Sequence, residues 1–263
     1  MDFLKRSLAP ITEEAWEEIE EQAREVLANR LTGRKVVDVV EPKGWEYSGI
    51  PEGRLDIKED SSDAVRYGIR KVSPLVETRK SFWLGVWELD NISRGAEDAD
   101  LSPLEDAAAE AAEFEEEVIY HGLPDAGIDG LFSSADSSVS LESGKSGLIE
   151  GVSEGITVLQ DSAIEGPYSL LVNKDLWLTI ASSSNGYPLK RQLEDLIGGS
   201  IVYSPKVDDP ALVSTRGGDV ELILGQDFSL GYEDHGDGKV RLFLTESFGL
   251  RVLEPAAIVN LET

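Results

Sequence analysis

The apolar positions of the first segment follow a helical period. Between residues 12 and 31, apolar side chains recur every three or four positions, at Trp16, Ile19, Ala23, Val26, Leu27 and Leu31. This spacing predicts an α-helix with one apolar face, and the acidic residues between these positions predict a solvated opposite face. Thr12 stands where an N-cap belongs, and we expect Gly33 to stop the helix.

A second long helix is predicted over residues 102–121. Ser102 and Glu105 have the spacing of a capping box, and Pro103 falls at the first helical position. Shorter helices are expected from the same kind of periodicity at 148–160, 174–182 and 189–197.

Segments rich in β-branched residues separate the helices. Residues 34–80 form a long extended excursion that is punctuated by Pro and Gly, with a polar tip at 59–63 and little apolar pattern of its own. Further strands are predicted at 168–173, 220–225, 239–248 and 256–261. A Ser- and Gly-rich stretch at 133–147 marks a candidate boundary, and the whole pattern predicts an α+β fold.

The charge of the chain excludes several classes of partner. Among 263 residues, 51 acidic side chains face 24 basic ones, which gives a formal net charge of −27. Nucleic acid and anionic lipid both call for a basic surface, so we expect neither nucleic acid nor a membrane as partner. No apolar run reaches the roughly 18 residues of a membrane span, and the first residues lack the apolar region of a signal peptide. Cysteine is absent, which excludes disulfides and thiolate metal sites and makes the cytoplasm the expected location.

The excess of acid also predicts the conditions in which the protein works. At 1 M salt the Debye length is about 3 Å, so repulsion among many carboxylates is screened. We interpret the chain as a protein from a halophile, and we expect it to unfold on dialysis to low salt.

One short motif imitates a nucleotide-binding loop. Gly144-Lys145-Ser146 resembles the end of a P-loop, but Val139 stands where that loop needs its first glycine. A flexible connector is the better interpretation.

The acidic run on the second helix does not match a metal site. Glu113, Glu116, Glu117 and His121 lie on one helix, whereas a carboxylate di-metal centre needs Glu-x-x-His pairs from several helices. His121 is expected to interact with the dipole at the helix C-terminus. Because a nucleophile elbow is absent as well, we expect no catalytic residue, no metal and no enzyme activity.

Six long segments carry a more specific signal than any short motif. They are MDFLKRSLAPITEEAWEEIEEQAREVLANRLTGRKVVDV at 1–39, GWEYSGIPEG at 44–53, FWLGVWELDNISRG at 82–95, EFEEEVIYHG at 113–122, IEGPYSLLVN at 164–173 and RGGDVELILGQDFSLGYED at 216–234. In sequence and in order these segments resemble the shell proteins of the encapsulin family. The resemblance spans nearly the whole chain and implies the HK97-type phage-capsid fold, with a P-domain, an A-domain and an extended E-loop.

The resemblance also implies how the chain is divided. Residues 1–48 would form the N-terminal arm and helix and the start of the P-domain, 49–80 the E-loop, 81–134 the P-domain with its spine helix, 135–224 the A-domain, and 225–263 the C-terminal part of the P-domain. An E-loop packs on a neighbouring subunit, which would explain why residues 49–80 show no core pattern.

The function implied by the resemblance is assembly. Such a subunit forms a hollow icosahedral nanocompartment, with about sixty copies (T=1) in the smallest shell, and encapsulates a cargo enzyme through the cargo's C-terminal peptide. A ferritin-like protein or a peroxidase is the class of cargo expected, with a role in iron storage or oxidative stress that depends on which it is. The alternative is the major capsid protein of an HK97-like virus or provirus, which the absence of a recognisable pro-segment disfavours.

A cargo-peptide site is implied between the N-terminal helix and the P-domain. The matching positions are Val26, Leu27, Arg34, Asp38, Phe228 and Leu230. An apolar groove with a few polar clamps suits a short peptide, because such a peptide binds through anchors. The alternative is that Val26 and Leu27 complete the core face of the helix.

Two further sites are implied in the same way. The loop that lines the five-fold pore matches Ser183, Ser184, Asn185, Gly186, Tyr187 and Pro188, and its alternative is an ordinary surface loop. Some encapsulins bind a flavin such as FMN, which would place an isoalloxazine ring on Trp87 and a phosphate on Arg79. Packing of Trp87 at the E-loop junction is favoured instead, so no cofactor is expected to be required.

Overall fold

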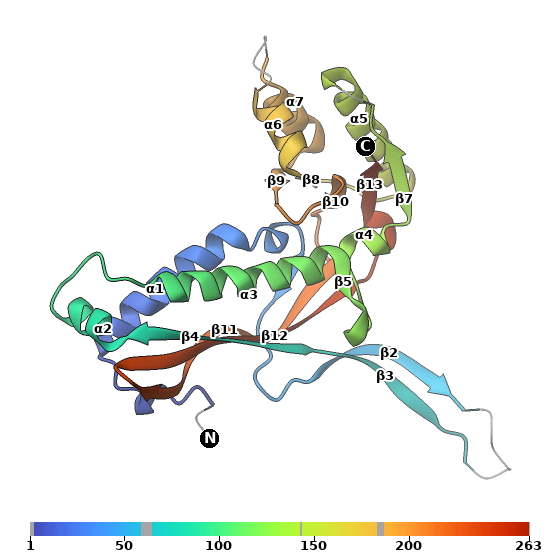
Figure 1. Ribbon diagram of the computed structural model, residues 1–263. Helices are drawn as coiled ribbons and strands as arrows, with labels where there is room; N and C mark the ends of the chain where they lie inside the picture. Colours follow the sequence, from blue (N-terminus) through green and yellow to red (C-terminus); the bar gives the residue numbers. More distant parts are fainter. Residues whose placement is uncertain (1–2, 59–64, 143, 183–186, 263) are drawn as a thin grey trace.

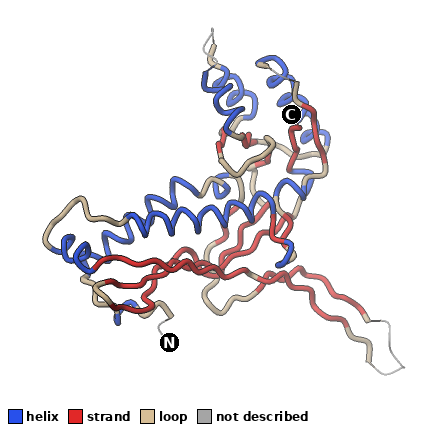
Figure 2. Tube along the Cα trace, in the orientation of Figure 1, coloured by secondary structure: helices blue, strands red, loops and turns tan. Residues whose placement is uncertain are grey.

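The chain folds into two bodies, each built on one sheet, and a hairpin that projects from the first body (Figure 1). The computed structural model describes residues 3–58, 65–142, 144–182 and 187–262. The two bodies meet where the C-terminal end of the long helix α3 reaches the second sheet, while the hairpin extends away from both (Figure 2).

The first body is a four-stranded sheet covered by helices on one face (Figure 1). Its strands are β1 (Asp38–Val40), β11 (Val220–Gly236), β12 (Lys239–Val252) and β4 (Val76–Gly85), in that order. Strand β1 runs parallel to β11, and the other pairs are antiparallel. The apolar faces of this sheet and of helices α1 and α3 form one buried cluster.

Helix α1 (Glu13–Arg30) confirms the first prediction, with one correction at its end. Thr12 Oγ1 accepts a hydrogen bond from Ala15 N at 3.2 Å, as expected of an N-cap. Gly33, however, lies in a 3₁₀ turn beyond the helix, and a Cβ there would come within 2.9 Å of Ile119 Cδ1 on α3. The glycine therefore permits close approach to α3 rather than stopping α1.

Helix α3 (Ser102–His121) has the predicted length, but the predicted capping box is wrong. The Asp100 carboxylate accepts hydrogen bonds from Ser102 N at 3.1 Å and from Ser102 Oγ at 2.6 Å. Glu105 instead accepts from Gln22 Nε2 of α1 at 2.7 Å. An acid two positions before the helix therefore displaced the predicted capping interaction. Helix α2 (Val86–Ser93) completes this side of the body.

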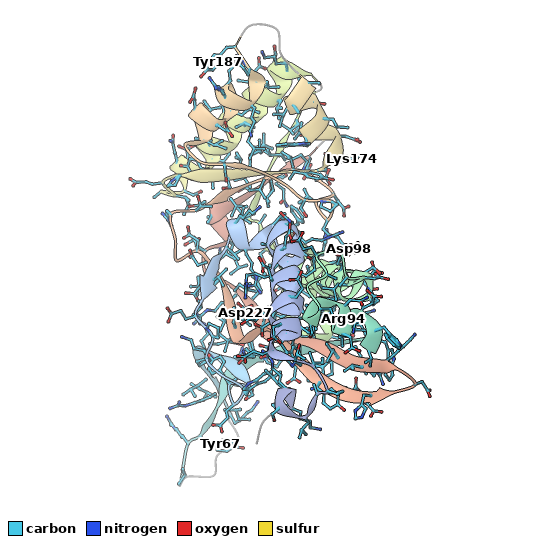
Figure 3. The ribbon with its side chains drawn as sticks, turned by 90° about the vertical axis from the view of Figure 1, so that its left-hand side faces the viewer. Tyr67, Arg94, Asp98, Lys174, Tyr187 and Asp227 are labelled. Carbon is cyan, nitrogen blue, oxygen red and sulfur yellow. The ribbon has the colours of Figure 1, made fainter. Side chains whose placement is uncertain are left out.

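The projecting hairpin is formed by β2 (Gly49–Ile57) and β3 (Gly68–Pro74). Ile50, at the base of β2, is buried. Six large apolar side chains farther out on the two arms are between 54% and 76% exposed, and they are Leu55, Ile57, Val65, Tyr67, Ile69 and Val72. Tyr67 lies toward the far end of the hairpin (Figure 3). The polar tip predicted at 59–63 lies outside the described residues.

The second body is a five-stranded sheet with three helices packed against it. The strand order is β7 (Ser137–Ser140), β13 (Ile258–Glu262), β10 (Ala211–Ser214), β8 (Tyr168–Val172) and β9 (Ile201–Tyr203). The helices are α5 (Lys145–Asp161), α6 (Lys174–Ser182) and α7 (Leu189–Ile197). The last two match the predicted ranges, whereas the stretch 133–147 is no simple connector, because it contains β7 and the start of α5.

The C-terminal strand corrects one expected boundary. Residues 225–263 were expected to return entirely to the first body, but β13 lies between β7 and β10 in the second sheet. Its side chains are mostly buried, and a short apolar strand carries no signal for which of two sheets it joins. The expected boundaries after residues 80 and 224 also fall inside β4 and β11.

Short elements connect the two bodies. They are β5 (Gly122–Leu123), β6 (Ile128–Asp129) and α4 (Leu131–Ser134), with 3₁₀ turns at Gly33–Lys35, Pro124–Ala126 and Pro255–Ala257. A further 3₁₀ turn, Arg6–Leu8, lies in the N-terminal segment beside the first body. Within the described part of the chain, no helix is both long and apolar enough to cross a lipid bilayer.

Candidate functional site

A groove of about 530 Å³ lies between the N-terminal segment, helix α1 and strand β11. Its apolar lining consists of Leu4, Ala23, Leu27, Ala28, Leu31, Phe228, Leu230 and Leu244. Charged side chains complete the wall at Arg6, Glu20, Arg24, Arg34 and Asp227. Asp227 lies beside α1 near the middle of the molecule (Figure 3).

The N-terminal segment forms one wall through a few specific contacts. Tyr232 N on β11 donates a hydrogen bond to Leu4 O at 2.8 Å. The Arg6 guanidinium pairs with Glu20 and lies 4.3 Å from the centre of the Trp16 ring. These contacts hold the segment against α1 and leave the groove open between them.

Four of the six residues predicted for a cargo peptide line this groove. Leu27, Arg34, Phe228 and Leu230 come together from α1, from the turn after it and from β11. Val26 is half-buried and packs against the core cluster beside α1, as the alternative interpretation proposed.

Asp38 does not line the groove. Its Oδ2 atom accepts a hydrogen bond from Gly218 N at 2.5 Å, in a separate cavity of about 150 Å³ near Thr215. Its position at the start of β1, beside the loop that precedes β11, fixes this contact.

Arg34 is the centre of a charged cluster at the floor of the groove. Arg34 Nε donates to Glu115 Oε1 at 2.9 Å, and Arg34 Nη2 donates to Glu246 Oε1 at 2.6 Å. Arg34 Nη1 donates to Asp227 Oδ1 at 3.0 Å. One guanidinium therefore pairs with three carboxylates. The Cζ atom of Arg34 also lies 5.4 Å from the centre of the Phe228 ring.

Burial sets the protonation of this cluster. Burial alone would lower the pKa of Arg34, but its hydrogen bonds to Glu115 and the charges of all three carboxylates raise that pKa above its ordinary value. Burial raises the pKa of Glu246 well above the usual carboxyl range, and the charge and hydrogen bond of Glu115 raise it further. A buried carboxyl near a second carboxylate favours its neutral form.

A bulge in the first sheet connects this cluster to the groove. On β11, Gln226 pairs with Ser247 and Ser229 pairs with Thr245. Two residues of β11, Asp227 and Phe228, therefore lie opposite the single residue Glu246 of β12, which is the geometry of a β-bulge. The bulge aims Phe228 into the groove and Asp227 at Arg34.

Sequence reasoning missed the three acids around Arg34. Glu115 is one of several acids in the run 113–117, and the periodicity does not single it out. Glu246 did carry a signal, since it is the lone acid inside the mainly apolar strand 239–248. A charge in such a strand is expected to be buried with a partner.

Another buried acid, Glu116, belongs to the fold rather than to a metal site. Glu116 accepts hydrogen bonds from Thr32 Oγ1, from Gly33 N at 2.5 Å and from Ser204 Oγ at 3.0 Å. Burial raises the pKa of Glu116. These contacts tie α1, α3 and the loop after β9 together. In the described residues, no group of three or more His, Cys, Asp or Glu side chains has the geometry of a metal site.

The predicted pore loop lies only partly within the described residues. Ser183, Ser184, Asn185 and Gly186 fall outside them. Tyr187 and Pro188 are both exposed. Tyr187 lies at the end of the second body that is farthest from the hairpin (Figure 3). Tyr187 Oη donates to Asp195 Oδ2 at 2.8 Å, which fixes the tyrosine on α7.

The two residues matched to a flavin do not form one site within a subunit. Trp87 is 74% exposed, so its expected packing is absent from the single chain. Arg79 lies 4.1 Å from the centre of the Phe243 ring and 5.2 Å from that of Phe3. At about 3.3 Å per residue along β4, Arg79 and Gly85 are roughly 20 Å apart, and Trp87 follows Gly85. An isoalloxazine on Trp87 would therefore find no phosphate partner in Arg79.

Comparison with known proteins places the chain among shell-forming proteins. Residues 1–249 match the family described as encapsulating protein for peroxidase. The chain is 38% identical over 263 residues to the type 1 encapsulin shell protein of Rhodococcus erythropolis, covering 99% of this chain and 100% of that protein. It is 36% identical to that of Brevibacterium linens, with 99% of both chains covered, and 35% identical to that of Mycobacterium tuberculosis, with 94% of both covered.

Solved structures with the same fold are viral or virus-like. The virus-like particle from Pyrococcus furiosus aligns with a TM-score of 0.65 at 20% identity, covering 92% of this chain and 98% of that one. The capsid of Myoviridae Phage XM1 aligns with a TM-score of 0.61 at 15% identity, covering 88% and 91%. The predicted HK97-type capsid fold is thereby confirmed.

Proposed function

Because the chain belongs to the encapsulin family of shell proteins, it is a subunit of a self-assembling nanocompartment, and we propose that its groove docks the C-terminal segment of a cargo protein. The observation that carries this proposal is the groove itself, which brings together Leu27, Arg34, Phe228 and Leu230 from distant parts of the chain. Its role is binding and not catalysis.

The shape and chemistry of the groove suit a short extended peptide. A volume of about 530 Å³ is within the usual range for a binding site, and the lining combines aliphatic side chains with charged ones. Small residues at Ala23 and Ala28 leave room beside Leu27, so that leucine-sized anchors of a peptide could reach the apolar floor. Because a few such anchors are enough for binding, the docking segment of the cargo protein can be short.

The hairpin supports the assembly of many copies. Its six large exposed apolar side chains belong to none of the buried clusters of the described residues, and such an apolar surface marks an interaction site. The arms at 49–58 and 65–74 carry five basic and two acidic side chains, a net charge of +3, in a chain of net charge −27. We therefore propose that each hairpin docks on the acidic surface of a second copy.

Icosahedral closure is the proposed outcome of these contacts. About sixty copies would form the smallest closed shell of this symmetry. The alternative, a viral major capsid protein, has less support, because identity to the phage capsid is 15% whereas identity to encapsulin shell proteins is 35–38% over nearly the full chain.

The remaining roles are proposals of narrower scope. Tyr187 and Pro188, at the end of the second body, would lie near a symmetry axis if that body surrounds one. The shell is proposed to act in the cytoplasm, without a required cofactor, on a cargo of the ferritin-like or peroxidase class. A flavin on Trp87 would need a phosphate partner other than Arg79 of the same subunit.

The proposal can be tested by loading a defined test cargo into the shell. A fluorescent protein with a flexible tail that carries leucines spaced by Gly and Ser is co-expressed with the shell protein, and particles are purified in high salt. We expect closed particles by electron microscopy and co-migration of fluorescence with them. Particles that never retain tailed cargo above the level of untailed cargo would contradict docking, and a monomer at every salt concentration would contradict assembly.

A further inference from the structure

We propose that Glu115 and Glu246 are positioning residues of the groove, which share one proton and hold the bulge at Asp227 and Phe228 in place through Arg34. The inference deepens the proposed function and rests on it, since it concerns the same groove. It makes docking of a peptide dependent on a proton that lies beneath the groove, out of contact with the peptide.

The arrangement of charges requires such a proton. The side chains of Glu115 and Glu246 are 0% and 1% exposed, and that of Arg34 is 17% exposed. Asp227 is the outermost acid, with 45% of its side chain exposed. With every group ionised, one cation would face three anions, two of them without water, and burial makes an uncompensated charge costly.

One atom of the cluster indicates where the proton lies. Glu246 Oε2 is buried, and no hydrogen-bond donor faces it among the described residues. A protonated Glu246 would carry an O–H at this position, and the Glu115 carboxylate is the hydrogen-bonding partner beside it. A single proton between the two carboxyls removes one negative charge and satisfies the orphan oxygen.

Few other charges face Glu246. Strand β4 presents Thr78 opposite it. The neighbouring Glu77 and Arg79 alternate to the other face of the strand, and the next charge on the face of Thr78 is Lys80, which pairs with Glu110 of α3. Strand β11 contributes Asp227, helix α3 contributes Glu115, and the turn after α1 contributes Arg34. Arg34 is therefore the one cation in direct contact with Glu246 in the described part of the chain.

Loss of the proton would act on the groove through the bulge. A second buried anion beside Arg34 repels Asp227, which is the only acid of the three that has a path to solvent. Asp227 Oδ1 also accepts from Phe228 N at 2.8 Å, so displacement of Asp227 moves the residue that forms the groove wall. Because Asp227 and Phe228 lie outside the regular ladder, they can move while the strands stay paired.

The direction of the effect follows from burial. A docked peptide covers the exposed edges of Arg34 and Asp227, which further disfavours a second anion in the cluster. Docking therefore takes up a proton, and affinity falls as pH rises, by at most about tenfold per pH unit for one proton. In Glu246→Gln the neutral form is permanent, so affinity stays high and changes little with pH.

The test measures peptide binding across pH in three proteins. A fluorescein-labelled peptide with leucines spaced by Gly and Ser is titrated onto wild-type shells, Glu246→Gln and Glu110→Gln, between about pH 5 and pH 9, where buried carboxyls titrate. Glu110 is the matched control, because it is an exposed acid of α3 that lies outside the groove. We expect a falling profile for the wild type and Glu110→Gln, and a flat profile for Glu246→Gln.

Two results would overturn the inference. A flat wild-type profile would refute it while leaving docking intact, whereas absence of binding at every pH would refute the proposed function itself. A falling profile that persists in Glu246→Gln would assign the proton to another group. If Glu246→Gln fails to fold, Glu115→Gln must flatten the profile instead, and the infrared band of a protonated carboxyl in empty shells must disappear in whichever variant folds.

Discussion

The β2–β3 hairpin and the floor of the groove depart from the usual distribution of side chains in opposite directions. In the hairpin, large apolar side chains are exposed on both strands. At the groove floor, carboxylates of Glu115 and Glu246 are buried around one arginine. Each departure marks a region that the single subunit leaves incomplete, since an exposed apolar strand needs a protein partner and a buried acid pair needs a proton.

The two regions also differ in how much substitution they tolerate before the fold is lost. The hairpin contributes little to the core, so its substitutions are expected to affect contacts between copies. The groove floor joins α1, α3 and the first sheet, so its substitutions affect both binding and stability. The comparison therefore separates assembly from docking, and each of the following experiments tests one side of it.

The largest effect is expected from charges placed on the hairpin. In the double variant Ile57→Asp, Tyr67→Asp, assembly should be lost entirely while the subunit stays folded, because both side chains are more than half exposed. Electron microscopy and size-exclusion chromatography in high salt measure this, with circular dichroism for the fold. Leu8→Asp, at an equally exposed apolar residue outside the hairpin, is the matched control and should assemble.

Blocking the groove should abolish loading without affecting assembly. Ala28→Trp fills the groove from an exposed position on α1, and retention of tailed cargo should fall at least about tenfold, as expected when an anchor pocket is lost. Glu25→Trp, on an exposed part of α1 outside the groove, should load normally. Normal retention of tailed cargo by Ala28→Trp shells would show that the groove is not the docking site.

A charge at Leu27 is a less selective probe of docking than Ala28→Trp. Leu27→Asp places a carboxylate in the apolar lining of the groove and should also abolish loading. Leu27 is only 9% exposed and belongs to the core beside α1, so a carboxylate there would also cost several kcal/mol of stability. Ala28→Trp avoids that cost.

Salt should act in opposite senses on two electrostatic contributions to assembly. Screening weakens the repulsion between copies of net charge −27 but also weakens the attraction of the hairpin arms, which carry +3. Replacing Arg54 and Arg70 with Gln should therefore raise the salt concentration needed for assembly by about twofold, as judged from the size of the pairwise effect of surface charges. Light scattering during dialysis measures the salt concentration at which half of the protein is assembled. An unchanged value in the variant would show that charges on the arms do not contribute to docking.

The smallest expected effect is a pH dependence of stability at the groove floor. The pKa of Glu246 is raised in the folded state, so stability is full below the unfolded pKa of about 4.3 and is lost as pH rises toward the folded pKa. The loss is about 1.4 kcal/mol for each pH unit within that window, and Glu246→Gln should lack it. Urea unfolding of the non-assembling Ile57→Asp, Tyr67→Asp subunit, with and without Glu246→Gln, measures the difference. Parallel stability curves would contradict the raised pKa.

The elements of this fold could be predicted where the apolar period was long. Helices α1 and α3 each extend over several turns, and their predicted ranges agree with the structure to within about a residue. The caps were less predictable, because Asp100 and Ser102 can both satisfy the same first turn and only the loop geometry decides between them. The placement of β13 could not be predicted, because the sequence of a short buried strand does not indicate which of two sheets it joins.

The groove was partly predictable for a related reason. Leu27, Phe228 and Leu230 line one groove, as the family resemblance implied, whereas Asp38 is held by a loop contact to Gly218 that depends on three-dimensional packing. The buried acids were hidden by the acidic composition of the chain, since one buried glutamate among many exposed ones leaves no periodic trace. Only an acid inside an apolar strand, as at Glu246, offered a local signal.

The position of β13 has a consequence for how the subunit is made. Strand β7 pairs with β13 in the second sheet, and β13 is completed only at residue 262. The first sheet is complete once β12 has been synthesised at Val252, whereas the second must wait for the last strand. A chain that stopped before residue 258 would lack β13, and β7 and β10 would lose the strand that lies between them. Completion of the second sheet therefore depends on the synthesis of one short strand near the end of the chain.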